Sequence, residues 1–516
     1  MVADGRIGVR IPRKQAKVSG HGQASRPGDV HEGDEGMPEY PLEPGRNGME
    51  QLGRALLEQA IGFVQSLAER PADGTAAGGG ELGDVVRDML MPPPAAPGDL
   101  AELLERVQRA MGLAVETAGA GYFGYIPGGG LFASAVADVW ARAANRYVGI
   151  AGFAPGLAAM EHSVVRWFCQ VLGLPAESGG GLLVSGGSMA NFSAVVAARH
   201  AQLGEEMARG ALYLTEHAHH SLGKAARLAG LPANSVRTVP CTPDLRMDVD
   251  AAAALIAADR AAGQKPFLLV ASAGTTNTGT VDPLLEMAAL AAQEGLWFHV
   301  DGAYGGLFRL TERGRARLQG IELADSVTLD PHKSLFLPYG TGALAVRDGD
   351  RLRAAHAVSG HYLQDLEADR DVPDFADLGL ELSRELRGLR VWLPLHLYGT
   401  AAFRAALDEK LDLAEMAYRR LAAESLLEVP WAPDLSVVAF RLRRVKAGVS
   451  DAAIDAANRR LLARINASQR VFLSSTVVDG RVTLRLCILS HRTHAAHVRE
   501  AVDIIVSAAR ATAAEG

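Results

Sequence analysis

The chain has 516 residues, too many for a single hydrophobic core, so two or three structural units are expected. Its 52 Lys and Arg residues against 59 Asp and Glu residues give a formal charge of −7, with no basic block, which argues against nucleic acid and anionic membranes as partners. The 48% hydrophobic and 22% charged residues are typical of a soluble globular protein, and no apolar run is long enough to span a bilayer.

The three cysteines, Cys169, Cys241 and Cys487, are far apart, and none lies in a CxxC or Cys/His pattern. Disulfide frameworks and structural zinc sites rely on such patterns. We therefore expect a chain that works in the reducing cytoplasm, with no disulfide and no metal site.

The first 130 residues have no core of their own. Residues 1–48 are rich in Gly, Pro and charge and predict a disordered tail. Apolar residues at helical spacing predict a helix from Met49 to about Leu67 and another from Asp99 to Met111. Two helices cannot bury a core alone, so we expect segment 49–130 to embrace a partner subunit.

That segment ends in the glycine-rich, aromatic stretch 121–130. Its glycines let a backbone approach a ligand closely, or they form a turn-rich linker.

Residues 131–395 alternate helical patterns with short apolar runs. The runs predict strands at 182–185, 212–215, 236–239, 267–271, 296–300, 326–329 and 343–347. Continuous apolar strands separated by helices predict a mainly parallel seven-stranded sheet covered on both faces, with ligands bound beyond the carboxyl ends of the strands.

Residues 396–516 change to long helices, predicted at 401–422 and 452–466, with shorter strands at 436–442 and 481–489. This composition predicts a small α+β C-terminal domain.

Two chemically useful side chains end predicted strands. Lys333 follows the run Ser326–Leu329 behind Asp330-Pro331-His332, and Asp301 ends the run before Gly302. An amine and a carboxylate at two strand ends suit a pyridoxal phosphate (PLP) enzyme, in which lysine forms a Schiff base and the acid pairs with the pyridinium nitrogen. The alternative is a structural Lys–Asp ion pair.

Two further strand ends carry glycines and hydroxyls. Ser185-Gly186-Gly187-Ser188 passes from a strand into a helix, whose free N–H groups form a phosphate cradle. A serine that merely caps the helix is the alternative. Thr275 lies in Gly274–Thr280, where hydroxyls suit a phosphate or ring oxygen, or a polar turn.

Three histidines, His217, His219 and His220, follow another strand. A flat imidazole can stack on a cofactor ring. Metal binding is the alternative, but no cysteine or carboxylate pattern accompanies the histidines.

Taken together, these motifs resemble the group II PLP-dependent amino acid decarboxylases, a family that includes aromatic-L-amino-acid and glutamate decarboxylases. The resemblance covers roughly residues 50–510, and Pro331-His332-Lys333 is its most specific part. It implies fold type I and an obligate homodimer with the active site at the interface.

The resemblance also implies roles for individual residues. Lys333 matches the Schiff-base lysine, Asp301 the pyridinium partner, His219 the histidine stacked over the ring and Ala303 the small residue under it. Gly187, Ser188 and His332 match positions around the phosphate, and Thr275 matches a nearby hydroxyl position.

Tyr362, in a polar stretch after the sheet, matches the proton donor on the family's mobile loop. Aldehyde-forming relatives commonly have phenylalanine there, so Tyr362 and His219 favour simple decarboxylation. A packing role for Tyr362 is the alternative.

Departures from the family concern the substrate and the phosphate. Tyr125 is retained at the entrance, but Ile126, Gly128 and Gly149 occupy positions that are bulkier or polar in animal aromatic decarboxylases. Asp330 replaces an asparagine near the phosphate, and its carboxylate would repel that anion unless it is turned away or paired.

The sequence thus predicts a homodimeric PLP enzyme that decarboxylates an L-amino acid with an aromatic or other large side chain. The alternatives are an aldehyde synthase, a lyase, an aminotransferase-like enzyme, or an inactive scaffold homologue.

Overall fold

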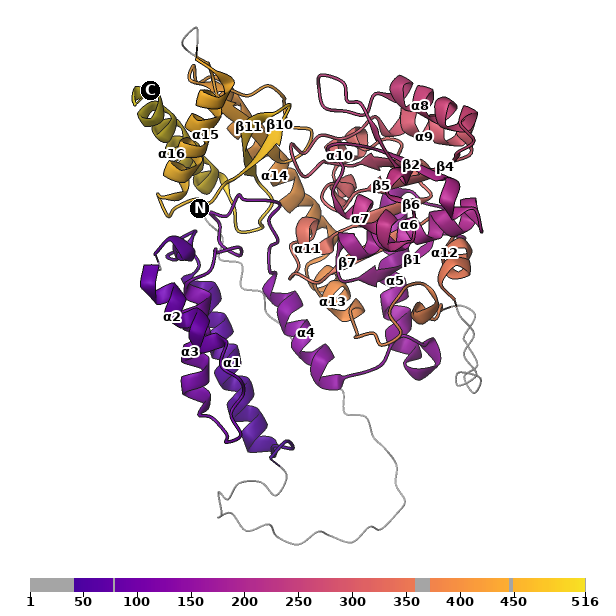
Figure 1. Ribbon diagram of the computed structural model, residues 1–516. Helices are drawn as coiled ribbons and strands as arrows, with labels where there is room; N and C mark the ends of the chain where they lie inside the picture. The colour runs from indigo at the N-terminus through magenta and orange to yellow at the C-terminus, as the bar shows by residue number, and fades with distance from the viewer. Residues whose placement is uncertain (1–40, 78, 358–371, 445–448, 516) are drawn as a thin grey trace, which may run out of the picture. The chain divides into compact units, whose positions relative to one another are not determined.

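The computed structural model (Figure 1) describes residues 41–77, 79–357, 372–444 and 449–515. The residues up to Val64 form one unit and those from Gln65 onward form the other. Helix α1 (Arg46–Ser66) lies mostly in the first unit, has no buried residue and begins three residues earlier than predicted. The remainder of the predicted tail, residues 1–40, is outside the described residues. Among the helices described, none has both the length and the apolar content to cross a membrane.

A seven-stranded sheet forms the centre of the large unit, in the order β1-β7-β6-β5-β4-β2-β3. Its strands are β1 (Gly180–Val184), β2 (Gly210–Thr215), β3 (Val236–Val239), β4 (Lys265–Ser272), β5 (Trp297–Asp301), β6 (Ser326–Leu329) and β7 (Gly342–Val346). Strand β7 runs in the direction opposite to that of the other six strands. All seven predicted strands are present, and the predicted fold class is confirmed.

Helices cover both faces of this sheet, which explains why its strands are apolar throughout. Successive strand residues contribute to opposite cores, as Leu182 and Val184 pack in one cluster and Leu183 in the other. The helices that pack on one face include α6 (Gly187–Leu203) and α7 (Ser221–Leu228), and those on the other include α5 (Pro155–Leu172) and α9 (Leu284–Glu294).

Six strands end at the same edge of the sheet. Strands β2, β3, β4, β5 and β6 run parallel, and β1 shares their direction because β1 and β6 are both antiparallel to β7. The segments that follow these strands contain the sequence motifs singled out above, so the topology alone brings them together.

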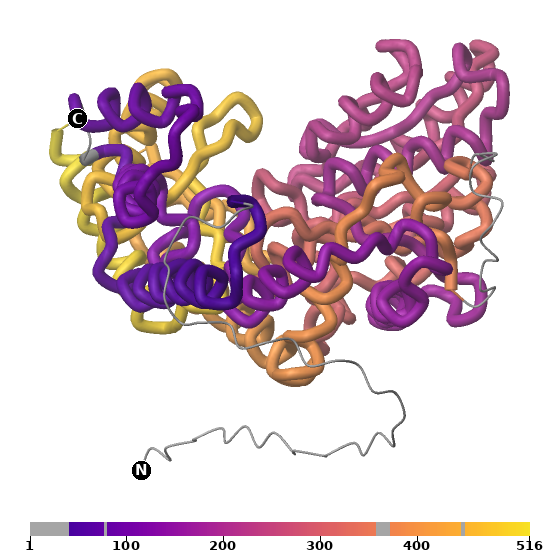
Figure 2. The backbone as a smooth tube through the Cα atoms, turned by 90° about the horizontal axis from the view of Figure 1, so that it is seen from below, coloured from indigo at the N-terminus to yellow at the C-terminus, as the bar shows by residue number. Residues whose placement is uncertain are grey.

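The C-terminal part has a four-stranded antiparallel sheet in the order β10-β11-β9-β8, coloured orange to yellow in Figure 2. The strands are β8 (Leu427–Glu428), β9 (Val437–Leu442), β10 (Ser474–Val478) and β11 (Arg481–Cys487), with helices α14 (Thr400–Ala422), α15 (Asp451–Asn466) and α16 (Ala495–Ala514). The sequence did not predict β8 or β10, because these elements are short or polar. A helix was expected to begin at the histidine cluster His491–His497, and α16 begins there.

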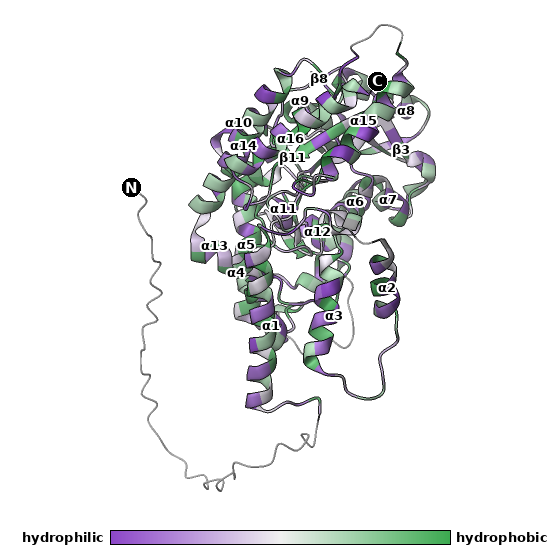
Figure 3. Cartoon of the chain, turned by 90° about the vertical axis from the view of Figure 1, so that its left-hand side faces the viewer, coloured by the Kyte–Doolittle hydropathy of each residue, from purple (hydrophilic) through white to green (hydrophobic). Residues whose placement is uncertain are grey.

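Helices before the large sheet leave apolar side chains exposed. Helix α3 (Leu100–Gly112), capped by Asp99, packs with α2 (Gly79–Met89), which the sequence did not predict. Figure 3 shows apolar residues beside hydrophilic ones along α1 and α3. On α4 (Phe132–Ala144), Val139 and Trp140 are 70% and 67% exposed.

Candidate active site

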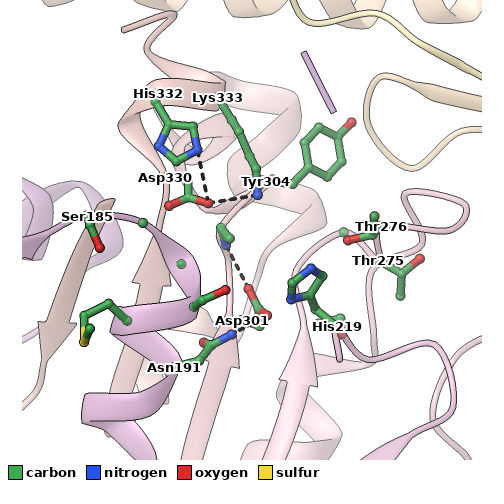
Figure 4. A pocket seen from close by; sticks show the side chains of 17 residues that line it. Ser185, Asn191, His219, Thr275, Thr276, Asp301, Tyr304, Asp330, His332 and Lys333 are labelled. Atoms are coloured by element: carbon green, nitrogen blue, oxygen red, sulfur yellow. Dashed lines mark hydrogen bonds and ion pairs between the residues drawn. The ribbon is translucent and has the colours of Figure 1, made fainter. Parts of the chain in front are cut away.

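A cavity of about 300 Å³ lies at the carboxyl edge of the seven-stranded sheet (Figure 4). Segments after β1, β2, β4, β5 and β6 all contribute to its walls. The lining residues are Ser185, Gly186, Gly187, Ser188, Met189, Asn191, His219, Ser272, Gly274, Thr275, Thr276, Asp301, Ala303, Tyr304, Asp330, His332 and Lys333. The structure therefore brings together every cofactor-site residue that the sequence suggested.

Lys333 lies on the short helix α11 (Pro331–Ser334), one turn after the end of β6. Its Nζ lies 2.8 Å from Oδ2 of Asp330, three residues earlier. The Asp330 side chain is only 4% exposed, whereas that of Lys333 is 22% exposed and reaches the cavity. Lys333 does form an ion pair, but with Asp330, the carboxylate whose charge seemed out of place beside a phosphate.

Asp301 ends β5, and two donors fix its carboxylate. Asn191 Nδ2 donates to Oδ2 at 2.9 Å, and the Ala303 backbone N–H donates to Oδ1 at 3.1 Å (Figure 4). Asn191 lies four residues after Gly187 on α6, so both residues face the cavity from one side of that helix. A buried carboxylate held in this way keeps its position without a cationic side chain.

Asn191 is also the centre of a buried hydrogen-bond network. Its Oδ1 accepts from Thr328 Oγ1 at 2.6 Å and lies 3.0 Å from Nε2 of His299. The other His299 nitrogen, Nδ1, lies 2.8 Å from Ser326 Oγ. Burial lowers the pKa of His299 to about 4, so this imidazole is neutral and can both donate and accept within the network.

His219 joins the same network through Ser221. The His219 Nδ1 atom lies 2.7 Å from Ser221 Oγ, which accepts from Asn191 Nδ2 at 2.9 Å. The His219 and His220 rings are 4.2 Å apart at an interplanar angle of 42°. Burial is the largest influence on His219 and lowers its pKa, so a neutral, flat imidazole faces the cavity near neutral pH.

The start of α6 forms a cradle without side chains. Gly186 is the N-cap and Gly187 the first helical residue, and the Ser185 and Ser188 side chains are exposed toward the cavity. A Cβ added at Gly187 would lie 3.0 Å from Asp330 Oδ2 and 3.1 Å from Ala303 Cβ. A side chain would therefore be crowded here, and the N–H groups at the start of a helix suit an anion.

Two remaining predicted residues complete the walls. His332 Nδ1 lies 2.7 Å from the Thr341 carbonyl, to which it donates, and burial lowers the His332 pKa. Thr275 is buried, and its hydroxyl lies 3.1 Å from that of Thr278.

The predicted substrate-pocket residues are not among those that line this cavity. Of the described residues, Tyr125, Ile126, Gly128 and Gly149 do not line this cavity. Gly128 lies against the Tyr339 ring and the His332 carbonyl, while Gly149 lies against Tyr147. Their role in substrate binding stays a prediction. Tyr362 falls outside the described residues.

Comparison with known proteins gives the site its context. Residues 89–443 match the model of the pyridoxal-dependent decarboxylase conserved domain. The chain belongs to the pyridoxal-dependent decarboxylase family. It is 34% identical to the aromatic-L-amino-acid decarboxylase of Bacillus atrophaeus, over 86% of this chain and 92% of that protein.

This decarboxylase is also similar to an aldehyde-forming relative, at 29% identity to the phenylacetaldehyde synthase of Arabidopsis thaliana over 74% of this chain and 80% of that one. Among solved structures, Oryza sativa TDC with PLP and tryptamine matches with a TM-score of 0.82 and 26% identity, covering 89% of this chain and 97% of that one.

PLP is the cofactor of this decarboxylase, and the residues present fit it. The cavity offers an amine at Lys333, a fixed carboxylate at Asp301, a flat imidazole at His219 and a glycine-lined helix start for a phosphate.

Sequence reasoning gave no role to Asn191 and left the partner of Asp330 open. Asn191 lies four residues after Gly187, on the same helix face, and this spacing could have indicated that Asn191 also faces the cavity. No local signal could have shown that Asp330, rather than Asp301, pairs with Lys333.

Proposed function

We propose that this protein removes the α-carboxyl group of an L-amino acid with an aromatic or other large side chain, releasing CO2 and the amine. The observation that carries the proposal is the convergence of Lys333, Asp301 and His219 on one cavity in a member of this family. The name of the Bacillus relative supports the aromatic substrate class.

Each residue has a distinct task in this proposal. Lys333 would hold the cofactor through Nζ, and Asp301 would hold a proton on the ring nitrogen. Asn191 and the Ala303 N–H keep Asp301 in place, because each occupies one carboxylate oxygen. His219 would support the ring with its neutral face. When bound, PLP supplies the electron sink that makes cleavage of the Cα–carboxylate bond possible.

Tyr362 is proposed to deliver the proton that Cα needs after CO2 leaves, on the resemblance described above. Exchange to phenylalanine removes that proton donor without removing the ring. Tyr362→Phe should therefore suppress amine formation and leave cofactor binding intact. Tyr418→Phe, on α14 in the C-terminal part, is the matched control and should behave as wild type. Undiminished amine production by Tyr362→Phe would refute the assignment.

The reaction itself is tested by a substrate screen. The twenty amino acids plus DOPA, 5-hydroxytryptophan and diaminobutyrate are incubated with the holoenzyme, and CO2, amine and ammonia are quantified. Amine and CO2 without ammonia or peroxide support the proposal. Aldehyde with ammonia and peroxide would favour the aldehyde synthase alternative, and the absence of any product would favour the inactive homologue.

We further propose that the protein is a homodimer whose active site is shared. Exposed apolar side chains on α3 and α4 support this, since helix faces on which exposed apolar side chains cluster mark interfaces. Tyr125 and Gly149 do not line the cavity of their own chain, which supports a pocket completed by a second copy. Mixing inactive Lys333→Ala with inactive Tyr125→Arg, after reversible dissociation, should restore activity if the site is shared. No recovery from a mixture that forms heterodimers would contradict it.

The cytoplasmic location stays a prediction from the sequence.

A further inference from the structure

One wall of the cavity is a loop outside the strands and helices. It runs from Gly274 to Thr280, after β4, and is called the threonine loop below; Gly274, Thr275 and Thr276 line the cavity. The loop is bonded to itself, since the Thr275 N–H donates to the Thr280 carbonyl at 2.8 Å and the hydroxyls of Thr278 and Thr280 lie 2.8 Å apart. It is therefore placed as one unit, and contacts from outside set where its cavity face lies.

Tyr304 makes the contact at the start of the loop. It follows β5, lines the cavity (Figure 4) and is 3% exposed. A Cβ added at Gly274, where φ is +96°, would lie 2.5 Å from Tyr304 Cδ1, so the glycine allows the ring to lie directly against the loop. Burial raises the pKa of Tyr304 above its usual range, so the hydroxyl keeps its proton and can both donate and accept a hydrogen bond.

Ser436, in the C-terminal part, holds that hydroxyl. Its backbone N–H donates to Tyr304 Oη at 2.7 Å, and the two hydroxyls lie 2.8 Å apart. Ser436 is fully buried, and its neighbour Val437 begins β9. A Cβ added at Gly279 would lie 2.9 Å from Val437 Cβ, so the same short segment of the C-terminal part also contacts the far end of the threonine loop.

A second contact reaches the middle of the loop. Asn277 Oδ1 accepts from Thr476 Oγ1, on β10, at 2.9 Å. On its other side, Asn277 Nδ2 lies 3.3 Å from Nδ1 of His217, two residues before His219. Asn277 therefore joins the loop both to the C-terminal sheet and to the segment that brings His219 to the cavity.

We infer that Tyr304 and Asn277 are positioning residues, which hold the threonine loop against the C-terminal part and so keep its hydroxyl-bearing face in the cavity wall. Tyr304 acts through Ser436, and Asn277 acts through Thr476. The described residues that line the cavity lie between positions 185 and 333, yet the C-terminal part is needed to place one of its walls. The inference rests on the proposed function, in which this wall lies against the bound cofactor.

The test compares two buried tyrosines. Tyr304→Phe removes the hydroxyl that Ser436 holds but keeps the ring against Gly274. Tyr213→Phe is the matched control, because Tyr213 is also buried and its hydroxyl donates to Asp259 at 2.7 Å, outside the cavity lining. Both substitutions should lower the denaturant midpoint of the apoprotein, since each leaves a buried polar group without its partner.

Only Tyr304→Phe should affect cofactor binding. The probe is 4′-deoxypyridoxine 5′-phosphate, which lacks the aldehyde and cannot bond covalently to Lys333. Its dissociation constant should rise about tenfold, and that of PLP by a similar factor. The visible circular dichroism of bound PLP, which arises from the asymmetry of its surroundings, should change in Tyr304→Phe and not in Tyr213→Phe. Amide hydrogen exchange should accelerate across residues 274–281 in Tyr304→Phe alone.

Thr476→Val tests the second contact and decides the matter if Tyr304→Phe does not fold. Valine has nearly the shape of threonine but no hydroxyl, so the substitution removes the hydrogen bond to Asn277. The deoxy analogue should bind about threefold more weakly. Thr512→Val, on α16, is the control: it removes a buried hydroxyl that donates to the Ala508 carbonyl and should leave binding unchanged.

Two failures are distinguishable. Wild-type affinity for the deoxy analogue in either Tyr304→Phe or Thr476→Val would show a merely structural role, which overturns the inference and leaves the proposed function intact. Weakened binding in both variants, together with a substrate screen in which the wild-type protein forms no amine, would support the inference and overturn the proposed function.

Discussion

The cofactor cavity and the segment at residues 118–130 are built in different ways. This segment, called the glycine-rich segment below, contains the glycine-rich stretch 121–130. In the cavity, Asn191, Thr328, His299 and Asp301 come from neighbouring strands and one helix, and their polar groups satisfy one another. In the glycine-rich segment the side chains of Tyr122, Phe123 and Ile126 are buried, and the backbone is held by hydrogen bonds from the C-terminal part of the chain.

Two arginines hold this segment. Arg485, which is buried on β11, donates to the Tyr125 carbonyl at 2.7 Å from 360 positions away. Arg492 donates to the carbonyls of Ala118, Gly129 and Gly130. The Asp301 wall of the cavity is therefore fixed by the sheet that forms it, whereas the segment that carries Tyr125 and Gly128 depends on a distant part of the chain. The following substitutions test that contrast.

The largest expected effect is on the cavity network. Asn191→Leu would leave Asp301 Oδ2, Thr328 Oγ1 and His299 Nε2 without their partner. Buried orphaned groups cost about 1–3 kcal/mol each, so the free energy of unfolding should fall by about 3 kcal/mol or more, and PLP should bind more weakly. Denaturant unfolding and PLP titration measure the two effects.

Ser193→Ala is the matched control on the same helix. Ser193 is buried, and its hydroxyl has no hydrogen-bond partner in the part of the chain that the structure describes. Its loss should change neither quantity measurably. Equal destabilisation by both substitutions would show that the network contributes nothing beyond ordinary helix packing.

In the glycine-rich segment, Gly129→Ala should be the most damaging small change. The added Cβ would lie 2.5 Å from His491 Nδ1 and 2.6 Å from Phe336 Cβ. Overpacking of this kind costs about 1–3 kcal/mol in the free energy of unfolding. Gly130→Ala has open space but φ = +61°, so it should cost only about 1 kcal/mol. Thermal unfolding of the pair decides whether close packing or backbone conformation limits this segment.

Arg492→Leu should loosen the segment itself. Three carbonyls would lose their guanidinium donor, at a cost of about 2 kcal/mol, and amide hydrogen exchange should accelerate across residues 118–130. If Tyr125 and Gly128 do contact substrate, KM should rise more than kcat falls. Arg419→Leu, which removes only an exposed pair with Glu415, should change stability by less than about 0.5 kcal/mol. Unchanged exchange in Arg492→Leu would show that the segment is held by other contacts.

A change of pH acts on both regions at once. Burial lowers the pKa of His299 in the cavity network to about 4 and that of His491 beside Gly129 to about 3. In the unfolded state both histidines bind a proton near pH 6.5, whereas in the folded state they stay neutral until about pH 4 and pH 3. The free energy of unfolding is therefore highest above pH 6.5 and falls as the pH drops toward 4 and 3. Each histidine should contribute a slope of up to about 1.4 kcal/mol per pH unit.

His491→Leu separates the two contributions. Its Nδ1 is buried and has no hydrogen-bond partner among the described residues, so an apolar replacement removes the titration without orphaning another group. The acid slope of the apoprotein's free energy of unfolding should become about half as steep, with the His299 part retained. An unaltered slope would mean that His491 does not remain neutral in the folded state.

Much of the fold and the cavity was predictable because its signals are local. Each central strand is a short apolar run, since the sheet is buried on both faces, and each run ends in a polar or glycine-containing motif. Once the strands are parallel, Ser185, His219, Thr275, Asp301 and Lys333 must share one edge. Strand β10 was missed because its burial alternates along a polar sequence, and α2 because glycines begin it.

The sequence by itself therefore determined the parallel sheet, the order of its motifs and the group of residues at its edge, because apolar periodicity and strand direction are properties of short stretches. Only the tertiary structure decided that Lys333 pairs with Asp330 rather than Asp301, since the pairing depends on the directions in which the Asp330 and Lys333 side chains leave the first turn of α11. It also decided that Asn191 links Asp301 to His219, and that Arg485 and Arg492 hold the glycine-rich segment. The hydrogen bond from Asn191 to Asp301 spans 110 positions of the chain and that from Arg485 to Tyr125 spans 360, and no local pattern encodes contacts over such separations.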